Sequence, residues 1–413
     1  MSVNKKYKLM VVGAAALQMP LIKRIKERGY ELVVVSPNPT EPGFEYADYS
    51  VIADVRDQDL ILEKARELKI DGAVTDQTDL AVRTVAYVTE KMGLSSIGYN
   101  ISCLFTDKVL MRKKCKELDL NPIPYALVHN LYDAIEFYDT LGAPAIIKPA
   151  DSQASKGVHK ITCRQDMIMY FKEAIDYSRN GKVIIEKFIN GFELLVDSLI
   201  VDGEIKVLTI GEYAPFAKKD VFSSHMTIFP SKCPKDVKEK VSTFNNQIIK
   251  KFGLNNSRTH AEYLYDGEKC YLVEIAARGG GVFISSDAVK FCAGISTEDF
   301  LIDAAVGNLY MPEPSSDFVG QYFGELFFYM PEGEIISIEG IEEVLKLPFV
   351  HNCLLTGIEV GIKTPPITDK NGRKLFTLTG NSYDELEKRM CLIKSMIDIK
   401  VRTDNGIEGI IWS

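Results

Sequence analysis

The sequence predicts an α/β and α+β protein whose N-terminal part is a doubly wound parallel sheet. Two observations support this prediction. Strands and helices alternate with short turns over residues 1–105, which is typical of a parallel sheet covered by helices. After residue 105, strands and helices follow one another in mixed order. A chain of 413 residues is also too long for one ordinary domain, so we expect two or three.

The N-terminal elements follow from apolar runs and helical periodicity. We expect strands at residues 8–12, 31–35 and 72–75, and helices at 17–28, 57–68 and 80–92, with Asp57 as a helix cap. The turn Gly13-Ala-Ala-Ala lacks the G-x-G-x-x-G fingerprint, so no dinucleotide is expected there. Small ligands bind at the carboxyl ends of such strands, here near Gly13 and residues 75–79.

The rest of the chain is predicted in two parts. Residues 106–312 begin with a basic helix at 107–118 that Thr106 is expected to cap, followed by strands at 145–148, 183–186 and 193–200. A helix at 236–252 has one apolar stripe and ends at Gly253. Residues 313–413 form a smaller α+β unit, with strands at 321–329, 334–338 and 373–379 and a helix at 383–399.

Composition narrows the class of protein. No apolar run approaches the roughly 20 residues that a membrane helix needs. A net charge of −8 argues against general nucleic-acid binding. Eight cysteines without Cys-x-x-Cys spacing indicate reduced thiols in a cytoplasmic protein. An enzyme without membrane or nucleic-acid partners is therefore expected.

The hairpin at residues 260–281 is the most informative segment of the chain. It has Glu262 in one strand and Glu274 in the other, and Arg278 with three glycines follows. Burying carboxylates in apolar strands costs free energy unless a positive group lies between them. A metal ion shared by the two glutamates would meet this condition, whereas an exposed hairpin with solvated glutamates is the alternative.

The length of the turn decides between these alternatives. A two-residue turn at Asp266-Gly267 pairs Glu262 with Tyr271 and leaves Glu274 on the opposite face. A three-residue turn over 266–268 pairs Glu262 with Leu272, so Glu274 becomes its diagonal neighbour on the same face. We expect the three-residue turn, because only a same-face register lets both carboxylates reach one hard cation.

Two upstream segments add candidate ligand-binding groups. Lys148 ends an apolar strand before a loop of small polar residues whose amides could hold a phosphate, although a Walker A motif is absent. A surface hairpin is the alternative. Glu186 and Glu193 flank a segment that offers carboxylates to an amine and to ribose hydroxyls, and backbone groups to an adenine edge. Two exposed glutamates around a turn are the alternative.

In chain order, these residues resemble the ATP-grasp family, whose members join a carboxylate to a nucleophile at the expense of ATP. The series is Lys108, Lys148 with its loop, Glu186 and Glu193, then Glu262 and Glu274 with Arg278. The resemblance covers essentially the whole chain and implies an ATP-grasp fold. Its parts would be a Rossmann-like domain at 1–105, an ATP-grasp domain at 106–312 with a lid at about 122–190, and an α+β lobe at 313–413.

The resemblance also implies a role for each residue that binds the nucleotide. Lys108 and Lys148 would hold the α- and β-phosphates of ATP. Ser155 and Lys156 would lie in the lid over the β- and γ-phosphates, with Lys156 in a catalytic role. The adenine and ribose contacts would come from the Glu186 carboxylate, the backbone of Lys187 and Ile189, and the Glu193 carboxylate.

The remaining implied roles concern the metal and the substrates. Glu262 and Glu274 would bind Mg²⁺, with Mn²⁺ as an alternative ion, and Arg278 would be catalytic, facing the γ-phosphate and an acyl phosphate. Ala276 replaces the asparagine of many members, which leaves one or two metal ions open. His225 lies where amino-acid ligases often place a substrate-contacting segment, with a loop histidine as the alternative. Three further candidates for ligand contacts are His260, Tyr213 and Phe216.

The Glu-x-Ala-Ala-Arg sequence followed by glycines resembles the L-amino-acid ligase and carbamoyl-phosphate-synthase-like branch. This implies a cytoplasmic homodimer that activates a small carboxylate, such as an amino acid, as an acyl phosphate and joins it to an amine, releasing ADP and phosphate. Two alternatives remain. One is an enzyme of the purine-biosynthesis type or one that uses bicarbonate or formate. The other is a catalytically silent nucleotide-binding protein.

Overall fold

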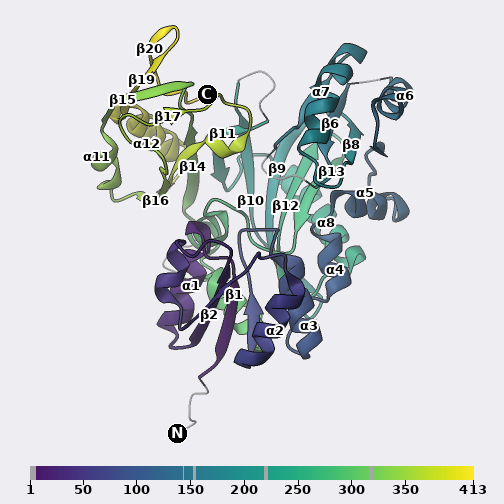
Figure 1. Ribbon diagram of the computed structural model, residues 1–413, viewed down its shortest axis with the longest axis vertical. Coiled ribbons are helices and arrows are strands. Elements are labelled where there is room, and N and C mark those ends of the chain that lie inside the picture. The colour runs from purple at the N-terminus through teal and green to yellow at the C-terminus, as the bar shows by residue number, and fades with distance from the viewer. Residues whose placement is uncertain (1–5, 143, 152–154, 218–221, 316–319) are drawn as a thin grey trace.

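The N-terminal part is a parallel sheet covered on both faces by helices (Figure 1). The computed structural model describes residues 6–142, 144–151, 155–217, 222–315 and 320–413. The sheet has the order β3-β2-β1-β4. Its strands are β1 (Lys8–Val12), β2 (Glu31–Ser36), β3 (Tyr49–Ile52) and β4 (Gly72–Val74). All of its pairs are parallel, which confirms the predicted doubly wound sheet.

Alternation along these strands buries both faces of the sheet. Helix α1 (Met19–Glu27) packs on Leu9 and Val11, while α2 (Gln58–Leu68) and α3 (Val82–Met92) cover Met10 and Val12. Asp57 caps α2 as expected, accepting a hydrogen bond from the Leu60 amide. The edge strand β3 was not expected from the sequence.

Helices α4 (Tyr99–Leu104) and α5 (Lys108–Glu117) follow. The prediction that Thr106 caps the basic helix is wrong, because Asp107 is the cap and accepts from the amides of Val109 and Leu110 at 2.9 and 3.1 Å. The Thr106 hydroxyl instead donates to the Ser102 carbonyl at the end of α4.

A second sheet lies between residues 125 and 187 and has the order β5-β8-β6-β7. The strands are β5 (Tyr125–Val128), β6 (Ala145–Pro149), β7 (His159–Ile161) and β8 (Val183–Lys187). Helices α6 (Leu131–Leu141) and α7 (Arg164–Asp176) pack on one face, against Ile147 and Ile185. The side chains next to them in sequence, Lys148 and Glu186, therefore point to the other face.

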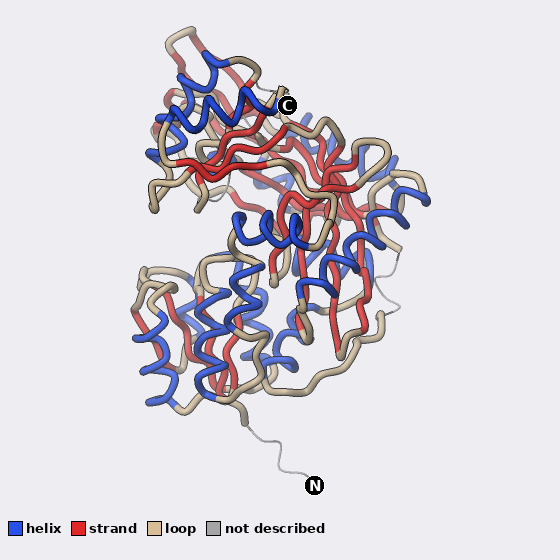
Figure 2. Tube along the Cα trace, turned by 90° about the vertical axis from the view of Figure 1, so that its right-hand side faces the viewer, coloured by secondary structure: helices blue, strands red, loops and turns tan. Residues whose placement is uncertain are grey.

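The largest sheet has eight strands in the order β13-β12-β9-β10-β11-β14-β18-β16. It continues across residue 312, so the central and C-terminal parts of the chain share one hydrogen-bonded sheet, as the upper half of Figure 2 shows. The predicted domain boundary at residue 312 does not coincide with a break in this sheet, and it stays a proposal. The strands are β9 (Phe192–Val201), β10 (Glu204–Pro215), β11 (Ser224–Phe229), β12 (Ser257–Tyr265), β13 (Cys270–Ala276), β14 (Tyr322–Phe328), β16 (Val350–Leu354) and β18 (Lys374–Gly380).

Helix α8 (Lys235–Phe252) covers one face of this sheet and builds the main core there. Its predicted apolar stripe is buried, and Gly253 ends the helix with a φ of 79°. Leu194 on β9 and Ala261 on β12 belong to this core. Because strand side chains alternate, Glu193 and Glu262 lie on the opposite face, which we call the site face.

The C-terminal part packs helix α12 (Tyr383–Met396) on β14 and β18. The predicted helix at 383–399 is too long, since Ile399 is buried in strand β19. A third sheet here has the order β17-β15-β19-β20. Its strands are β15 (Gly333–Glu339), β17 (Lys363–Thr364), β19 (Asp398–Thr403) and β20 (Gly406–Gly409), and the remaining α-helices are α9 (Val289–Ala293), α10 (Thr297–Ala305) and α11 (Ile341–Leu345).

Two further features concern membrane spans and cysteines. In the described ranges, no helix combines the length and apolar character needed to cross a membrane. All eight cysteines lie in these ranges and none forms a disulfide.

Candidate nucleotide and metal site

Glu262 and Glu274 lie directly opposite each other on the site face of strands β12 and β13. The predicted three-residue turn is wrong. The loop has four residues, 266–269, because Tyr265 pairs with Cys270, and Asp266 closes it by accepting from the amides of Glu268 and Lys269.

A bulge then restores the same-face arrangement. Tyr263 pairs with Leu272, but Glu262 pairs with Glu274, so Val273 is the extra residue on β13. A β-bulge of this kind shifts the alternation by one position. Without it, Glu262 would face Val273 and Glu274 would point to the α8 core. The two carboxylates therefore share a face through a bulge and not through the turn.

The charges around this pair suit a divalent cation. Lys108 at the start of α5 donates to Glu274 Oε1 at 2.9 Å, and the Tyr213 hydroxyl lies 3.4 Å from Glu262 Oε1. Burial favours the neutral form of Glu274, but the charges of Lys108 and Arg278 outweigh it and lower its pKa to about 2. Burial and the negative charge of Glu262 raise the pKa of Glu193 to about 8.

The two glutamates suit magnesium, an ion that is seldom bound by protein ligands alone. No set of three or more His, Cys, Asp or Glu side chains in the described chain is arranged to hold a metal ion. Magnesium usually takes one or two carboxylates and completes its shell with phosphate oxygens and water. Glu262 and Glu274 match this donor set.

A buried ion triad lies between α5 and the second sheet. Arg112 Nε and Lys148 Nζ donate to the two oxygens of Glu186 at 2.6 and 2.7 Å, and all three residues are at most 8% exposed. Burial would raise the pKa of Glu186, but the charges of Arg112 and Lys148 lower it to about 2. The triad brings two of the predicted residues together and adds Arg112, which the sequence analysis missed.

The backbone after Glu186 has an open acceptor. The Lys187 amide donates to the Pro124 carbonyl at 2.9 Å. Proline has no N–H to return this bond, so the carbonyl of Lys187 receives no hydrogen bond from β5. Ile189 follows two residues later and is half-buried.

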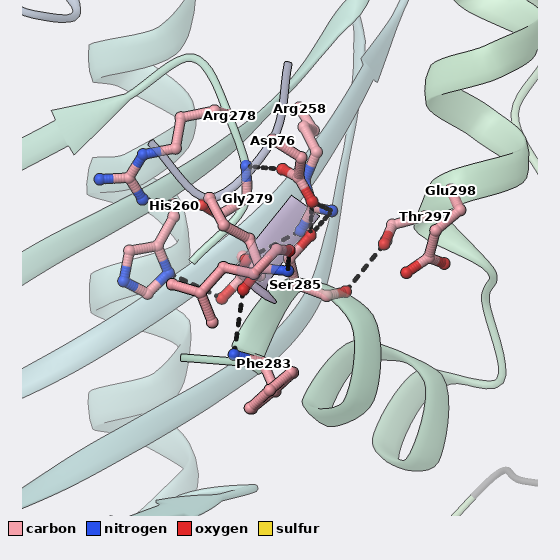
Figure 3. Close-up of polar contacts among 12 residues, drawn as sticks. Asp76, Arg258, His260, Arg278, Gly279, Phe283, Ser285, Thr297 and Glu298 are labelled. Carbon is pink, nitrogen blue, oxygen red and sulfur yellow. Dashed lines mark hydrogen bonds and ion pairs between the residues drawn. The ribbon is translucent and has the colours of Figure 1, made fainter. Parts of the chain in front are cut away.

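The Arg278 segment is held by the carboxyl end of β4. Arg278 donates through Nε and Nη2 to both oxygens of Asp79, at 2.9 and 2.6 Å. The amide of Gly279 donates to Asp76 at 2.8 Å, and the Ser285 hydroxyl donates to the same carboxylate. Figure 3 shows Asp76 between Gly279, Ser285 and Arg258. Residues 75–79, expected near a ligand, thus anchor the loop that follows the hairpin.

The anchored loop has an unusual backbone. Val282 and Phe283 have positive φ values of 51° and 69°, which non-glycine residues adopt only at a cost. The Phe283 amide donates to the Gln77 side chain at 3.0 Å, and a π-helix at Ile284–Ala288 follows. Strain and π-helical turns of this kind often accompany functional sites.

Beneath this loop lies a second buried network. Arg258 is fully buried and donates to the Ser285 hydroxyl at 2.6 Å and to Asp197 at 3.2 Å. The His260 ring contacts the other oxygen of Asp197 at 2.9 Å. Asp197 thereby fixes the ring of His260 on the site face, two residues from Glu262. A direct role of His260 toward a ligand stays a prediction.

The other predicted residues lie outside these networks. They are Ser155, Lys156, His225 and Phe216. Ser155 and Lys156 lie in the turn before β7, and neither side chain bonds to another candidate residue within the described ranges. His225 lies on strand β11, so its reading as a loop histidine is wrong, and its ring contacts the Pro215 carbonyl at 2.9 Å. Phe216 is buried against Tyr329.

The comparisons with known proteins identify related folds. Residues 141–287 match the ATP-grasp domain family. The matched segment has the fold of an ATP-grasp domain. Its fold aligns with an L-amino acid ligase from Bacillus licheniformis at a TM-score of 0.82 and 19% identity, over 97% of this chain and 100% of the other. A phosphoribosylglycinamide synthetase from Anaerococcus prevotii gives a TM-score of 0.74 at 19% identity, over 96% and 99%.

A sequence relative extends the match. The carbamoyl phosphate synthase large chain of Clostridium acetobutylicum is 26% identical over 263 residues, which cover 62% of this chain and 24% of that protein. The chain therefore spans only a fraction of that relative's length. At these identities, the structural matches establish the ATP-grasp fold and leave substrates open.

One residue of the candidate site that the sequence analysis missed has a sequence signal. Arg112 lies four positions after Lys108 on a helix, so both must share one helix face. Asp76 and Asp79 belong to the segment 75–79 that was expected near a ligand, because they follow a buried strand of the parallel sheet.

Replacing Arg112 by methionine should lower the free energy of unfolding by about 3–5 kcal/mol, because it leaves Glu186 buried with Lys148 alone. Chemical denaturation followed by circular dichroism measures this. The matched control is Lys113→Met, one position along the helix, whose side chain is 67% exposed. A loss below about 1 kcal/mol for the Arg112 variant, the range of a surface ion pair, would contradict the triad.

Gly280→Ala should destabilise the protein by about 1–3 kcal/mol, because its Cβ would lie 2.7 Å from Ile284 and 2.8 Å from the His260 ring. Gly281→Ala is the control, since nothing lies within 4 Å of its Cβ. Thermal denaturation compares the two variants. Equal melting temperatures would show that the loop does not pack on His260 as described.

Proposed function

We propose that the chain is an ATP-dependent, ADP-forming carboxylate–amine ligase. The observation that carries this proposal is the opposed pair Glu262 and Glu274, with Lys108 on one carboxylate and Arg278 close enough to lower the pKa of the same residue. Two carboxylates flanked by cations are suited to a phosphate-bound metal ion. The proposed state is a cytoplasmic homodimer, as the resemblance implies.

The nucleotide would lie between the second sheet and the site face of the large sheet. The open carbonyl of Lys187 would accept from the adenine amino group, beside the backbone of Ile189 and the Glu186 carboxylate. Glu193 would bind the ribose hydroxyls. Lys108 and Lys148 would hold the α- and β-phosphates, and Ser155 and Lys156 would close over the β- and γ-phosphates.

Glu262 and Glu274 would hold the magnesium ion. When bound, the ion offsets negative charge on the β- and γ-phosphates. Lys108, bonded to Glu274 in this structure, would then be released to a phosphate oxygen. With Ala276 in place of a further ligand, the proposed metal site has two carboxylates.

The chemistry requires no nucleophile from the protein. A carboxylate oxygen of the substrate attacks the γ-phosphorus, the bond to the β-phosphate oxygen breaks, and ADP leaves. An amine nitrogen then attacks the acyl carbon, and inorganic phosphate leaves with the bonding electrons of the C–O bond.

The chain would stabilise both steps through the anchored loop. Asp79 holds the Arg278 guanidinium by one edge, so its remaining N–H groups can face the phosphoryl oxygens. The amides of Gly280 and Gly281 would bind the oxyanion of the second step, whereas the Gly279 amide is already bonded to Asp76. A closed lid would exclude water from the acyl phosphate.

The direct test measures ADP release from Mg-ATP over pairs of amino acids. The proposal expects release that depends on both a carboxylate and an amine. Release with one carboxylate and no amine requirement would favour the type that uses bicarbonate or formate. Tight ATP binding without release for any carboxylate would favour the silent nucleotide-binding protein.

Glu274→Gln should abolish ADP formation while the circular dichroism spectrum is unchanged, because it removes a charged metal ligand and the partner of Lys108. Coupled-enzyme kinetics measures the rate. Glu268→Gln, at the exposed tip of the same hairpin, is the control and should keep full activity. Near-normal turnover of the Glu274 variant would remove the metal assignment.

Asp79→Asn should lower kcat by about 10- to 100-fold with little change in KM for ATP, because Arg278 loses its charged bidentate partner and its orientation. Steady-state kinetics separates the two constants. The control is Asp59→Asn, which affects only an exposed contact with Tyr87. An unchanged kcat would show that Arg278 needs no anchoring by Asp79.

A further inference from the structure

A row of polar side chains crosses the site face and has no role in the proposed chemistry. Cross-strand pairing places Tyr213 opposite Thr227, Thr227 opposite Glu325, and Glu325 opposite Thr377. Directly opposed residues of antiparallel strands lie on the same face. We call these four residues the polar row. Its first member, Tyr213, contacts Glu262 through its hydroxyl, and its last members lie in the C-terminal part.

Glu325 is the most unusual member of the polar row. It is fully buried, and neither carboxylate oxygen has a hydrogen-bond partner of acceptable geometry within the described residues. The hydroxyl of Thr227 beside it is also buried without a partner there. Burial raises the pKa of Glu325 to about 8, and Thr227 and Arg373 offset only part of this effect. Unpaired buried carboxylates are rare, because each costs several kcal/mol.

The π-helix brings further acceptors to the same place. Asp287 accepts from the Asn352 amide at 2.6 Å and from the Thr377 hydroxyl at 3.5 Å, and its negative charge contributes to the raised pKa of Glu325. The Ser286 hydroxyl is buried without a partner in the described chain. Two carboxylates therefore lie close together at Glu325, and no donor of the described residues bonds to Glu325 itself.

The nearby cations Arg373 and Lys370 make other contacts and do not bond to Glu325. Arg373 lies over the Phe327 ring at 4.2 Å and donates to the Ser224 hydroxyl at 3.4 Å. Lys370 lies over the Tyr213 ring at 5.4 Å. A metal ion is also disfavoured, because Asp287, the second carboxylate here, already accepts from Asn352 and Thr377. A ligand that brings several N–H donors and one positive charge fits best, and a primary ammonium group has three such donors.

We propose that Glu325 and the Thr227 hydroxyl bind the protonated primary amino group of a small carboxylic substrate. This inference rests on the proposed function, since it assigns one end of a ligase substrate. A protonated nitrogen cannot attack an acyl carbon, so the group at Glu325 serves recognition.

The distance from the metal pair sets the shape of this substrate. Two strand spacings separate Tyr213 from Glu325, which puts about 10 Å between their backbones. The ammonium group therefore lies several bonds from the carboxylate that is activated. The half-buried side chains of Tyr213 and Arg373 lie close enough to Glu325 to interact with its charge.

Ethylammonium chloride is a suitable probe for this subsite. Its binding to the full-length chain is measured by saturation-transfer NMR, with ethanol as the uncharged probe of similar size. We expect ethylammonium to bind, and ethanol not to. Glu325→Gln should weaken ethylammonium binding by about tenfold or more, and Thr227→Val by a smaller factor. The control is Glu334→Gln, an exposed glutamate on β15.

Two results overturn the proposal. One is equal affinity of ethylammonium for the wild type and Glu325→Gln, and the other is no binding to the wild type. The ADP-release assay is read separately. If no carboxylate supports ADP release but ethylammonium binding depends on Glu325, the ligase function fails and the subsite stands. If release occurs and the Glu325 variant binds ethylammonium normally, the subsite alone fails.

A stability measurement tests whether the variant folds and whether Glu325 is buried. The pKa of Glu325 rises from about 4.5 to about 8 on folding, so the wild type loses stability relative to Glu325→Gln as pH rises through this window. The variant should melt at a higher temperature than the wild type at pH 8, with the gap closing near pH 5. The charged or titratable groups facing Glu325 are Asp287, Arg373, Lys370 and Tyr213, and all are common to both proteins. A constant gap across this range would contradict the buried, unpaired state.

Discussion

The hydrogen bonds of Asp76 and Asp79 to the Arg278 loop are the contacts on which the candidate site depends. They join the carboxyl end of β4, in the parallel sheet, to the segment that leaves the large sheet after Glu274. The loop contains residues in a strained backbone, so it would relax without these partners. Arg278 and the π-helix that carries Asp287 both take their positions from this one junction between the N-terminal and central parts.

In this structure, the site's main charges are paired with one another. Lys108 pairs with Glu274, Lys148 and Arg112 pair with Glu186, and Arg278 pairs with Asp79. Paired charges are tolerated in a partly buried site, whereas single ones are expensive. Binding a nucleotide with its metal ion would exchange partners and would not introduce uncompensated charge. Glu193, Glu262 and Glu325 differ, because no described cation forms an ion pair with them.

Much of the architecture was predictable, because it follows from periodicity. The parallel sheet and the α8 stripe each come from local patterns. The carboxylate pair on one face was expected only because a shared metal ion requires it. The bulge that puts Glu262 and Glu274 on the same face was not predictable, since nothing in the residues around Val273 signals it. Arg112 was missed because a helix sequence does not show what its buried face meets. The polar row was missed because β11 pairs with β14, and β14 with β18, across long stretches of sequence.

In the proposed mode of nucleotide binding, the proline opposite Lys187 affects the choice of base. A backbone carbonyl without a sheet donor accepts a hydrogen bond from an amino group and repels another carbonyl oxygen. At this position the chain would favour a purine with an amino substituent over one with an oxo group. Because the selecting atom belongs to the main chain, no side-chain substitution at Lys187 can reverse that preference. It would change only if Pro124 were replaced by a residue with an amide hydrogen, which would close the acceptor.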